Sequence, residues 1–457
     1  MKNLQSGEKL DRSTLRPGAG RNHLRRLLKH SLARSSLTYV AGALISAVIA
    51  FAHISLLTRI LSPHAYGLVS MYEVAIGLLI PLLSLNVHAP VTVQFFIRDK
   101  ADLPKYIGTQ TIIIIISSMA FLLIFYFAGS QISHLIALPQ SWLWSLVVVC
   151  SCLSIQKVAA ALWLAQNRAG IQVIVGIVQN LTALLLTVVF VVGLRLDWAG
   201  RVLSIIISVA ITALFGIALM VREGSIAASF DRESARSGLG FGIPLIPHEL
   251  GSISLSSLHR FFIANMVGMS AIGIYSVGFQ IATIMNILVE SFNRAYVPWL
   301  FERLRRHDRA TNRQIVRFTY QYFVLIAVVG LGLWGLLSLC LKFIVGSSFL
   351  AALPYIPWII ASFVFNGMYL MVTNYILFAA KTHLIGIVTM FTAVLNAALT
   401  YIMIRYNGAL GAAQAMAVSY LVLFLLTWAL SARVFPMPWF GRADRPTRSA
   451  ACGNGSE

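Results

Sequence analysis

Apolar stretches alternate along the chain with short polar segments, and most of these stretches contain few charged residues. An apolar run of about 20 residues is long enough to cross the hydrocarbon core of a bilayer as an α-helix. The stretches lack the strict apolar–polar alternation of membrane β-strands, so helices are expected rather than a barrel. The pattern predicts twelve spans, at roughly 36–58, 66–89, 106–128, 141–166, 171–193, 199–220, 241–267, 271–297, 316–345, 352–378, 382–404 and 410–434.

The composition agrees with an all-α integral membrane protein of about twelve transmembrane helices. Of the 457 residues, 58% are hydrophobic and 11% are charged, and the mean hydropathy is +0.81. The formal net charge of +20 is of a size often found in nucleic-acid-binding proteins. Here the basic residues lie between the apolar runs, so membrane topology explains them and no nucleic acid is expected. The four cysteines show neither a disulfide framework nor metal-ligand spacing, so no metal is expected.

The basic residues also predict an orientation in the membrane. With a cytoplasmic N-terminus, 27 of the 35 lysines and arginines lie on segments that face the cytoplasm. Five lie on segments that face outward and three lie within spans. An excess of lysine and arginine on the cytoplasmic side is the usual determinant of orientation. Both termini are therefore predicted to be cytoplasmic.

One long loop divides the predicted spans into two sets of six. Residues 21–35, before the first span, place four leucines on one helical face and basic residues around it. This segment is expected either to lie on the anionic lipids of the cytoplasmic leaflet or to extend the first span as a solvated helix. The predicted organisation is an N-terminal segment at 1–35, an N-lobe at 36–220, a cytoplasmic linker at 221–240, a C-lobe at 241–435 and a disordered cytoplasmic tail at 436–457.

The two halves contain a weak internal repeat. Residues 57–77 align with residues 263–283 at an offset of 206 positions, and both segments lie at the first outward turn of a six-span half. Both halves start on the same side, so the repeat is parallel, with an axis along the membrane normal. Such two-lobed arrangements are typical of transporters. The identities are Ala65 with Ala271, Gly67 with Gly273, and Ser70 with Ser276.

The first repeat segment also resembles a family signature. "LLTRILSPHAYGLVS", residues 56–70, follows the basic "LLKHSLARSS" and resembles the amino-terminal signature of polysaccharide biosynthesis membrane proteins. "GIYSVGFQIA" at 273–282 and "NGALGAAQAMAVSYLV" at 407–422 resemble later parts of the same family. These proteins are lipid-linked oligosaccharide (O-antigen-type) flippases of the multidrug/oligosaccharidyl-lipid/polysaccharide exporter superfamily. The matching signature positions are Leu57, Thr58, Arg59, Leu61, Ser62, Pro63, Tyr66 and Gly67.

The resemblance implies a non-enzymatic function. An undecaprenyl-diphosphate-linked oligosaccharide would move across the bacterial cytoplasmic membrane for the synthesis of surface polysaccharide, such as lipopolysaccharide or exopolysaccharide. Two six-helix bundles would face a central cavity that opens to each side in turn. A glycan polymerase and a chain-length regulator are the implied partners, no cofactor is expected, and a proton or sodium gradient is a candidate driving force. The alternatives are a multidrug or small-molecule antiporter of the same superfamily and a membrane glycan polymerase or ligase.

Ionisable groups within spans are costly and therefore mark candidate sites. Lys157 in the fourth span could hold the diphosphate of the carrier, or extend towards the inner interface and pair structurally. In the seventh span, Glu249, Ser256 and Arg260 share one helix face, which either lines a cavity or binds a neighbouring helix. In the eighth span, Glu290 and Arg294 are spaced to pair with one another, and Asn286 extends the polar face.

Glu73 lies about two turns into the second span and needs an explanation of its own. It could take up a proton or a sodium ion when burial raises its pKa. Alternatively, it could pair with a basic group such as Arg59 near the outer mouth. The structural pair is the favoured expectation, and ion coupling remains the alternative.

Overall fold

The computed structural model describes residues 19–98, 102–305, 308–379 and 381–439, and every regular element in these ranges is helical. Short 3₁₀ or π segments lie at Gln140–Trp142, Val188–Gly193, Ile243–Leu245 and Ser347–Ala352. The α-helices are α1 (Ala19–Ile60), α2 (Pro63–Ser84), α3 (Val91–Ile97), α4 (Leu103–Ile136), α5 (Leu143–Ala165), α6 (Ala169–Thr187), α7 (Asp197–Arg222), α8 (Arg232–Gly242), α9 (Ile246–Met266), α10 (Met269–Leu304), α11 (Arg309–Ile344), α12 (Ile356–Phe378) and α13 (Thr382–Val434).

The prediction of an all-α membrane protein is confirmed. Ten helices in the described residues are long and apolar enough to cross a membrane. One of them, α13, consists of two helices that meet at Gly408, whose φ of 56° and ψ of −142° are non-helical. The polar helix α9 is not among the ten. The count of twelve spans therefore stays a prediction.

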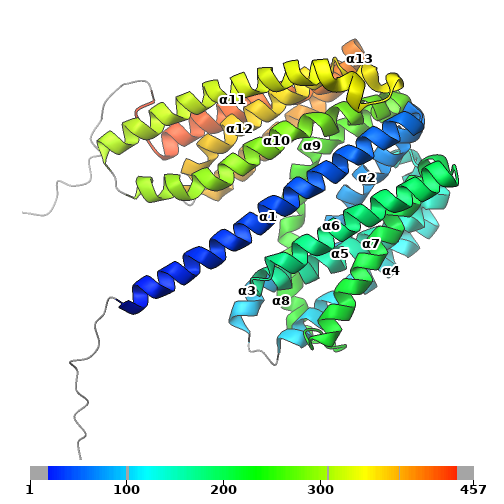
Figure 1. Cartoon of the computed structure of the whole chain (residues 1–457), viewed down its shortest axis with the longest axis horizontal. Helices are drawn as coiled ribbons and strands as arrows, with labels where there is room; N and C mark the ends of the chain where they lie inside the picture. Colours follow the sequence, from blue (N-terminus) through cyan, green and yellow to red (C-terminus); the bar gives the residue numbers. More distant parts are fainter. Residues whose placement is uncertain (1–18, 99–101, 306–307, 380, 440–457) are drawn as a thin grey trace, which may run out of the picture.

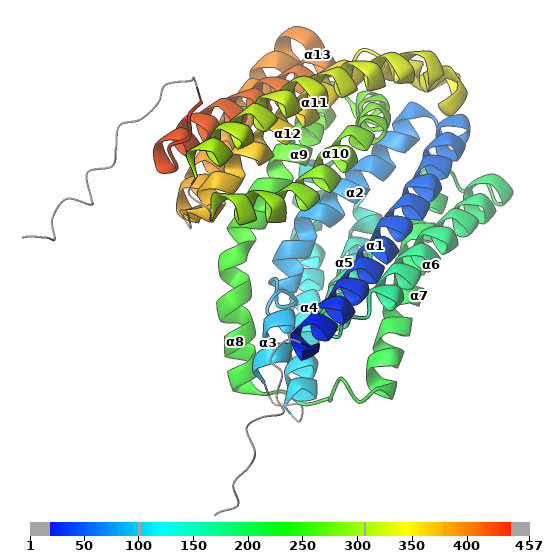
Figure 2. The ribbon, with the colours of Figure 1, turned by 60° about the vertical axis from the view of Figure 1, so that its left-hand side comes forward.

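The helices form two lobes that meet along α2 and α10. In the first lobe α1 packs on α6 and α5 packs on α2, α4 and α7, while in the second α12 packs on α10, α11 and α13. The lobes diverge towards the ends at which α1 begins and α13 ends (Figures 1 and 2). The contact between α2 and α10 places the two repeat segments side by side. The predicted two-lobed architecture is thus present.

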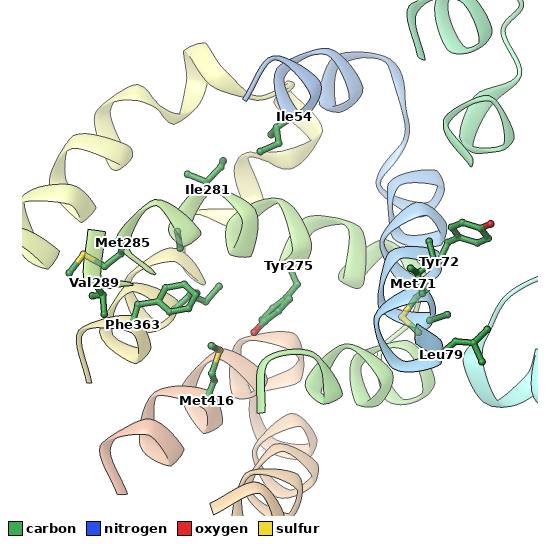
Figure 3. Close-up of a cluster of buried hydrophobic side chains, with 14 of the residues drawn as sticks. Ile54, Met71, Tyr72, Leu79, Tyr275, Ile281, Met285, Val289, Phe363 and Met416 are labelled. Carbon is green, nitrogen blue, oxygen red and sulfur yellow. The ribbon is translucent and has the colours of Figure 1, made fainter. Parts of the chain in front are cut away.

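Each of these two contact helices also has a face packed within its own lobe. Figure 3 shows Tyr72 and Leu79 on α2 pointing away from α10, and the Tyr72 hydroxyl lies 2.9 Å from that of Ser145 on α5. On α10, Tyr275 packs against Tyr355 with ring centroids 5.7 Å apart, and Met285 is buried. Burial of such side chains stabilises each lobe separately.

The turn before α2 is fixed by the signature motif. The Ser62 hydroxyl accepts a hydrogen bond from the Ala65 backbone N–H at 3.2 Å, which caps the helix, and Pro63 occupies its first turn. At the equivalent turn before α10, Gly268 has a φ of 124°, a conformation that favours glycine. Both turns let the chain reverse within a few residues.

The structure adds detail to two of the predicted segments. The backbone of residues 21–35 continues α1 without a break, which agrees with an extension of the first span rather than a separate surface helix. The linker at 221–240 contains most of α8, which is docked on the first lobe: Gln110 Nε2 donates to Ser234 O at 3.0 Å, and Arg98 donates to the Ser234 hydroxyl at 3.1 Å. Hydrogen bonds from Ser234 hold the pKa of Asp231, which caps α8, below its ordinary value.

The predicted disordered tail is wrong for its first residues. Trp439 is only 6% exposed, and its ring packs against those of Tyr320, Tyr375 and Trp428. The Tyr320 hydroxyl also donates to the Trp439 main-chain oxygen. The physical reason is apolar burial: the segment after α13 carries large side chains that fill space between α11, α12 and α13. Residues 440–457 lie outside the described residues.

The orientation can be tested on either side of α11. This helix has 36 residues, so it is about 54 Å long and exceeds the hydrocarbon thickness of about 30 Å. We expect a fluorescent-protein fusion after Arg309 to fluoresce and an alkaline-phosphatase fusion there to be inactive, with the reverse result after Gly346. The same compartment for both positions would contradict the predicted topology.

Candidate functional site between the lobes

A cavity of about 350 Å³ lies at the boundary between the lobes and is lined by α1, α2, α6, α7 and α10. One part of its lining is apolar and comes mainly from α1 and α10, including Ala47, Phe51, Ile284 and Ile287. The other part is polar. Its polar side chains are His53, Tyr66, Glu73, Asn180, Arg201, Gln280 and Thr283.

An ion pair occupies the polar part of this cavity. Arg201 Nη2 lies 3.6 Å from Glu73 Oε1, with side chains 12% and 35% exposed respectively. Arg201 Nη1 lies 3.3 Å from His53 Nε2 and 3.4 Å from the hydroxyl oxygens of Thr187 and Ser204. Because a guanidinium can only donate, His53 Nε2 must accept and carries no proton. Arg201 therefore ties four helices of the first lobe together.

Glu73 forms the expected pair with a basic group, but its partner is Arg201 and not Arg59. Arg59 instead donates to the main-chain oxygen of Phe343 at 2.9 Å, on an exposed edge of the protein. The sequence had indicated only that Arg201 is one of the few basic residues on outward-facing segments. A weak signal was available, since Arg201 falls in the first turns of a strongly apolar helix.

The second lobe contributes an arginine to the same region. Arg260 on α9 is only 8% exposed, and its guanidinium lies 4.6 Å from the centroid of the Phe279 ring. Its Nε has no hydrogen-bond partner, and Glu73, Tyr66 and Tyr275 lie within electrostatic range. One carboxylate is thus placed near two arginines from opposite lobes, which leaves a net positive charge.

A direct hydrogen bond crosses the lobe boundary beside this cluster. The Tyr66 hydroxyl on α2 donates to Gln280 Oε1 on α10 at 2.7 Å. Both side chains line the cavity. Sequence reasoning named Tyr66 only as part of a family signature and did not single out Gln280.

Lys157 lies apart from this cluster. Its ammonium is within electrostatic range of His88 and Cys150, both in the first lobe. Burial, and then the Lys157 charge, lower the pKa of His88 to about 4, so this imidazole is neutral at pH 7. In the part of the chain that the structure describes, no ion pair joins Lys157 to Glu73, and the role of Lys157 in holding the diphosphate stays a prediction.

Ser256 and Asn286, two of the other predicted residues, have local partners. Ser256 donates to Ile253 O at 3.2 Å, and Glu249, on the same helix, is partly buried. Asn286 Oδ1 accepts from Asn366 Nδ2 at 3.2 Å. These contacts fix side chains within the second lobe.

The predicted pairing of Glu290 with Arg294 is not present in this conformation. The exposed Arg294 donates to the main-chain oxygen of Glu290 at 3.4 Å, because its long side chain folds back along the helix. Among the described residues, the Glu290 carboxylate forms no ion pair.

Comparison with known proteins places this geometry in a family. The pattern of the family described as "Polysaccharide biosynthesis protein" matches residues 32–304, which is more than half of the chain and includes most of the cavity lining. The chain belongs to the polysaccharide biosynthesis protein family. A relative from the Lsg locus of Haemophilus influenzae is 25% identical over 382 residues, which cover 82% of this chain and 92% of that protein.

Two solved structures share the fold of this family member. An inward-facing multidrug resistance MATE family transporter of the MOP superfamily has a TM-score of 0.71 at 13% identity, covering 85% of this chain and 94% of that one. The lipid II flippase MurJ in an inward closed conformation has a TM-score of 0.70 at 11% identity, covering 87% of each chain. The protein is thus a multi-pass membrane protein with the fold of flippase-type transporters.

Proposed function

We propose that the protein is a non-enzymatic flippase that moves an undecaprenyl-diphosphate-linked oligosaccharide across the bacterial cytoplasmic membrane by alternating access. The observation that carries the proposal is the Glu73–Arg201 ion pair in a cavity lined by both lobes, with Arg260 of the second lobe within electrostatic range of Glu73. A site built from both lobes changes its geometry when the lobes move. The family match supports a role in surface polysaccharide synthesis.

The charge of the cluster suits an anionic group. Guanidinium groups bind phosphate oxygens in a bidentate, charge-assisted manner. In this structure Glu73 neutralises Arg201, while Arg260 faces an aromatic ring and has an unpartnered Nε. Arg260 is therefore the guanidinium that is available to bind the diphosphate. Arg201 becomes available as well when Glu73 moves away from it.

The remaining lining suits the lipid end of such a substrate. Phe51 on α1 and Ile287 on α10 line the cavity and are also exposed on the protein surface. Apolar side chains of this kind favour a polyprenyl chain next to the diphosphate. The cavity volume of about 350 Å³ is that of a small-ligand site, so most of the glycan must lie outside it.

Reconstituted transport tests this function. We expect vesicles that contain the protein to expose a fluorescent undecaprenyl-diphosphate-linked oligosaccharide to an impermeant quencher faster than protein-free vesicles do. The control lipid carries the same glycan without the diphosphate and should move at the protein-free rate. Movement of a cationic dye without movement of the lipid would replace the proposal by a multidrug antiporter.

The same vesicles address the driving force and the partners. We propose a proton or sodium gradient as the driving force. Glu73 is the candidate coupling group, and the alternative is that its carboxylate has a structural role only. A glycan polymerase and a chain-length regulator are the proposed partners. Glycan elongation by the protein alone would indicate a polymerase or ligase instead.

A further inference from the structure

The two repeat segments touch each other at equivalent positions. Ser70 Oγ on α2 donates to Ser276 Oγ on α10 at 2.5 Å, and both residues are almost fully buried. They are 206 positions apart, which is the offset of the sequence repeat. A residue that contacts its own equivalent lies on the pseudo-two-fold axis relating the two lobes.

Each of two equivalent glycines packs against a backbone carbonyl of the other lobe. A Cβ atom on Gly67 would lie 2.1 Å from the Met269 carbonyl oxygen, and one on Gly273 would lie 1.9 Å from the Pro63 carbonyl oxygen. Pro63 and Met269 are themselves equivalent positions in the repeat. The contact is therefore reciprocal, and neither glycine can carry a side chain without a backbone shift.

We call the four residues Gly67, Ser70, Gly273 and Ser276 the axial seam. Small residues at helix contacts allow close backbone approach in membranes. The seam lies next to the α1–α2 and α9–α10 turns, at the end of the molecule where the lobes are joined (Figure 2). Other hydrogen bonds between the lobes lie at this same end, from Arg59 to Phe343 O, from Gly346 N to Thr58 Oγ1 and from Tyr66 to Gln280.

We propose that the axial seam closes the transport pathway at this end and separates in each cycle. The inference rests on the proposed function, because it assumes movement by alternating access. The seam suits a reversible closure because its surface is self-complementary and its four members are small. Beside it, the Tyr66 and Phe349 rings meet edge to face across the lobes, with centroids 5.4 Å apart. The seam's own closing contacts are one hydroxyl pair and close backbone packing.

Cysteine cross-linking tests the seam directly. In a chain whose four native cysteines are replaced by alanine, Ser70→Cys with Ser276→Cys places two sulfurs where the hydroxyl oxygens are 2.5 Å apart, close to the disulfide length of about 2.05 Å. We expect mild oxidation to link most molecules, as detected by mass spectrometry of the joined peptides. Ser70→Cys with Ser291→Cys is the matched control, since Ser291 lies about 22 Å further along α10.

The linked protein tests the role in the cycle. We expect the Ser70–Ser276 cysteine pair to stop lipid-linked oligosaccharide transport when oxidised and to restore it on reduction. Cross-linking no greater than in the Ser291 control would overturn the seam geometry. Full transport by the oxidised protein would overturn its role as a closure.

Opening can also be measured without a substrate. Gly67→Ala forces a shift against Met269, whereas Gly77→Ala on the same helix meets no atom within 4 Å. With a single cysteine at position 70, we expect an impermeant thiol reagent added at this end to label the Gly67→Ala protein about tenfold faster than the Gly77→Ala control. Equal labelling rates would contradict the proposal. If labelling and cross-linking follow expectation but no lipid moves, the seam stands and the proposed substrate fails.

Discussion

Substitution of Glu73 by glutamine will destabilise the protein, and substitution of Arg201 by glutamine in the same chain will recover part of the loss. The carboxylate pairs with Arg201 at 3.6 Å in the cavity between the lobes. Removing one charge leaves the other without its counter-ion, which is worse than removing both. Glu73 is 35% exposed. The Glu73→Gln substitution should therefore lower the free energy of unfolding by about 1–3 kcal/mol, which is less than the loss expected when a fully buried pair is broken.

The measurement is a double-substitution cycle on purified protein. Thermal unfolding of the wild type, Glu73→Gln, Arg201→Gln and the double variant gives the coupling between the two side chains. Arg201 also contacts His53, Thr187 and Ser204 at 3.3–3.4 Å. Arg201→Gln should therefore destabilise the protein more than Glu73→Gln does. Arg59→Gln is the matched control, because Arg59 donates to Phe343 O instead and should give no recovery.

The same variant separates a structural pair from a coupling site. A coupling carboxylate must lose its partner during the cycle, so Glu73→Gln would fold normally while transport stopped responding to any imposed proton or sodium gradient. A structural carboxylate gives the opposite result, with lower stability and an unchanged response to gradients. We expect the structural result, and a stable but uncoupled variant would contradict it.

Local sequence signals predicted the features that depend on neighbouring residues. The hydrophobic runs predicted the helical membrane fold, and Ser62 and Pro63 indicated the turn before α2. The repeat predicted which residues of the two halves are equivalent. It did so because Gly67 and Ser70 are constrained by contact with their own counterparts.

Features that depend on helix rotation and distant packing were not predictable in this way. Arg201 reaches Glu73 because α2 and α7 belong to one bundle, and neither residue carries a local sign of the other. The four-residue spacing of Glu290 and Arg294 permits a pair, yet Arg294 reaches the backbone instead. Trp439 follows two prolines, at positions 436 and 438, beyond the last apolar run. Its burial depends on a space that three helices of the second lobe create together.

Arg260 is the residue whose loss should affect transport most. Its guanidinium is buried at the lobe boundary, is held over Phe279 and keeps an unpartnered Nε. A charge-assisted hydrogen bond to a phosphate is worth about 1.5–3 kcal/mol, which corresponds to about 10- to 100-fold in affinity. We expect Arg260→Ala to raise the lipid-linked oligosaccharide concentration needed for half-maximal flipping by about this factor.

Two further variants distinguish binding from packing. Arg260→Lys retains the charge but loses the planar, two-pronged hydrogen-bonding geometry of the guanidinium. Its concentration for half-maximal flipping should therefore lie between those of the wild type and Arg260→Ala. Lys157→Ala removes a cation whose neighbours are His88 and Cys150 rather than the arginine cluster, and it should leave the concentration dependence unchanged. If Arg260 served only to pack against Phe279, Arg260→Ala would lower the melting temperature while half-maximal flipping stayed at the wild-type concentration. That outcome, or an equal effect of Lys157→Ala, would remove Arg260 from the diphosphate site.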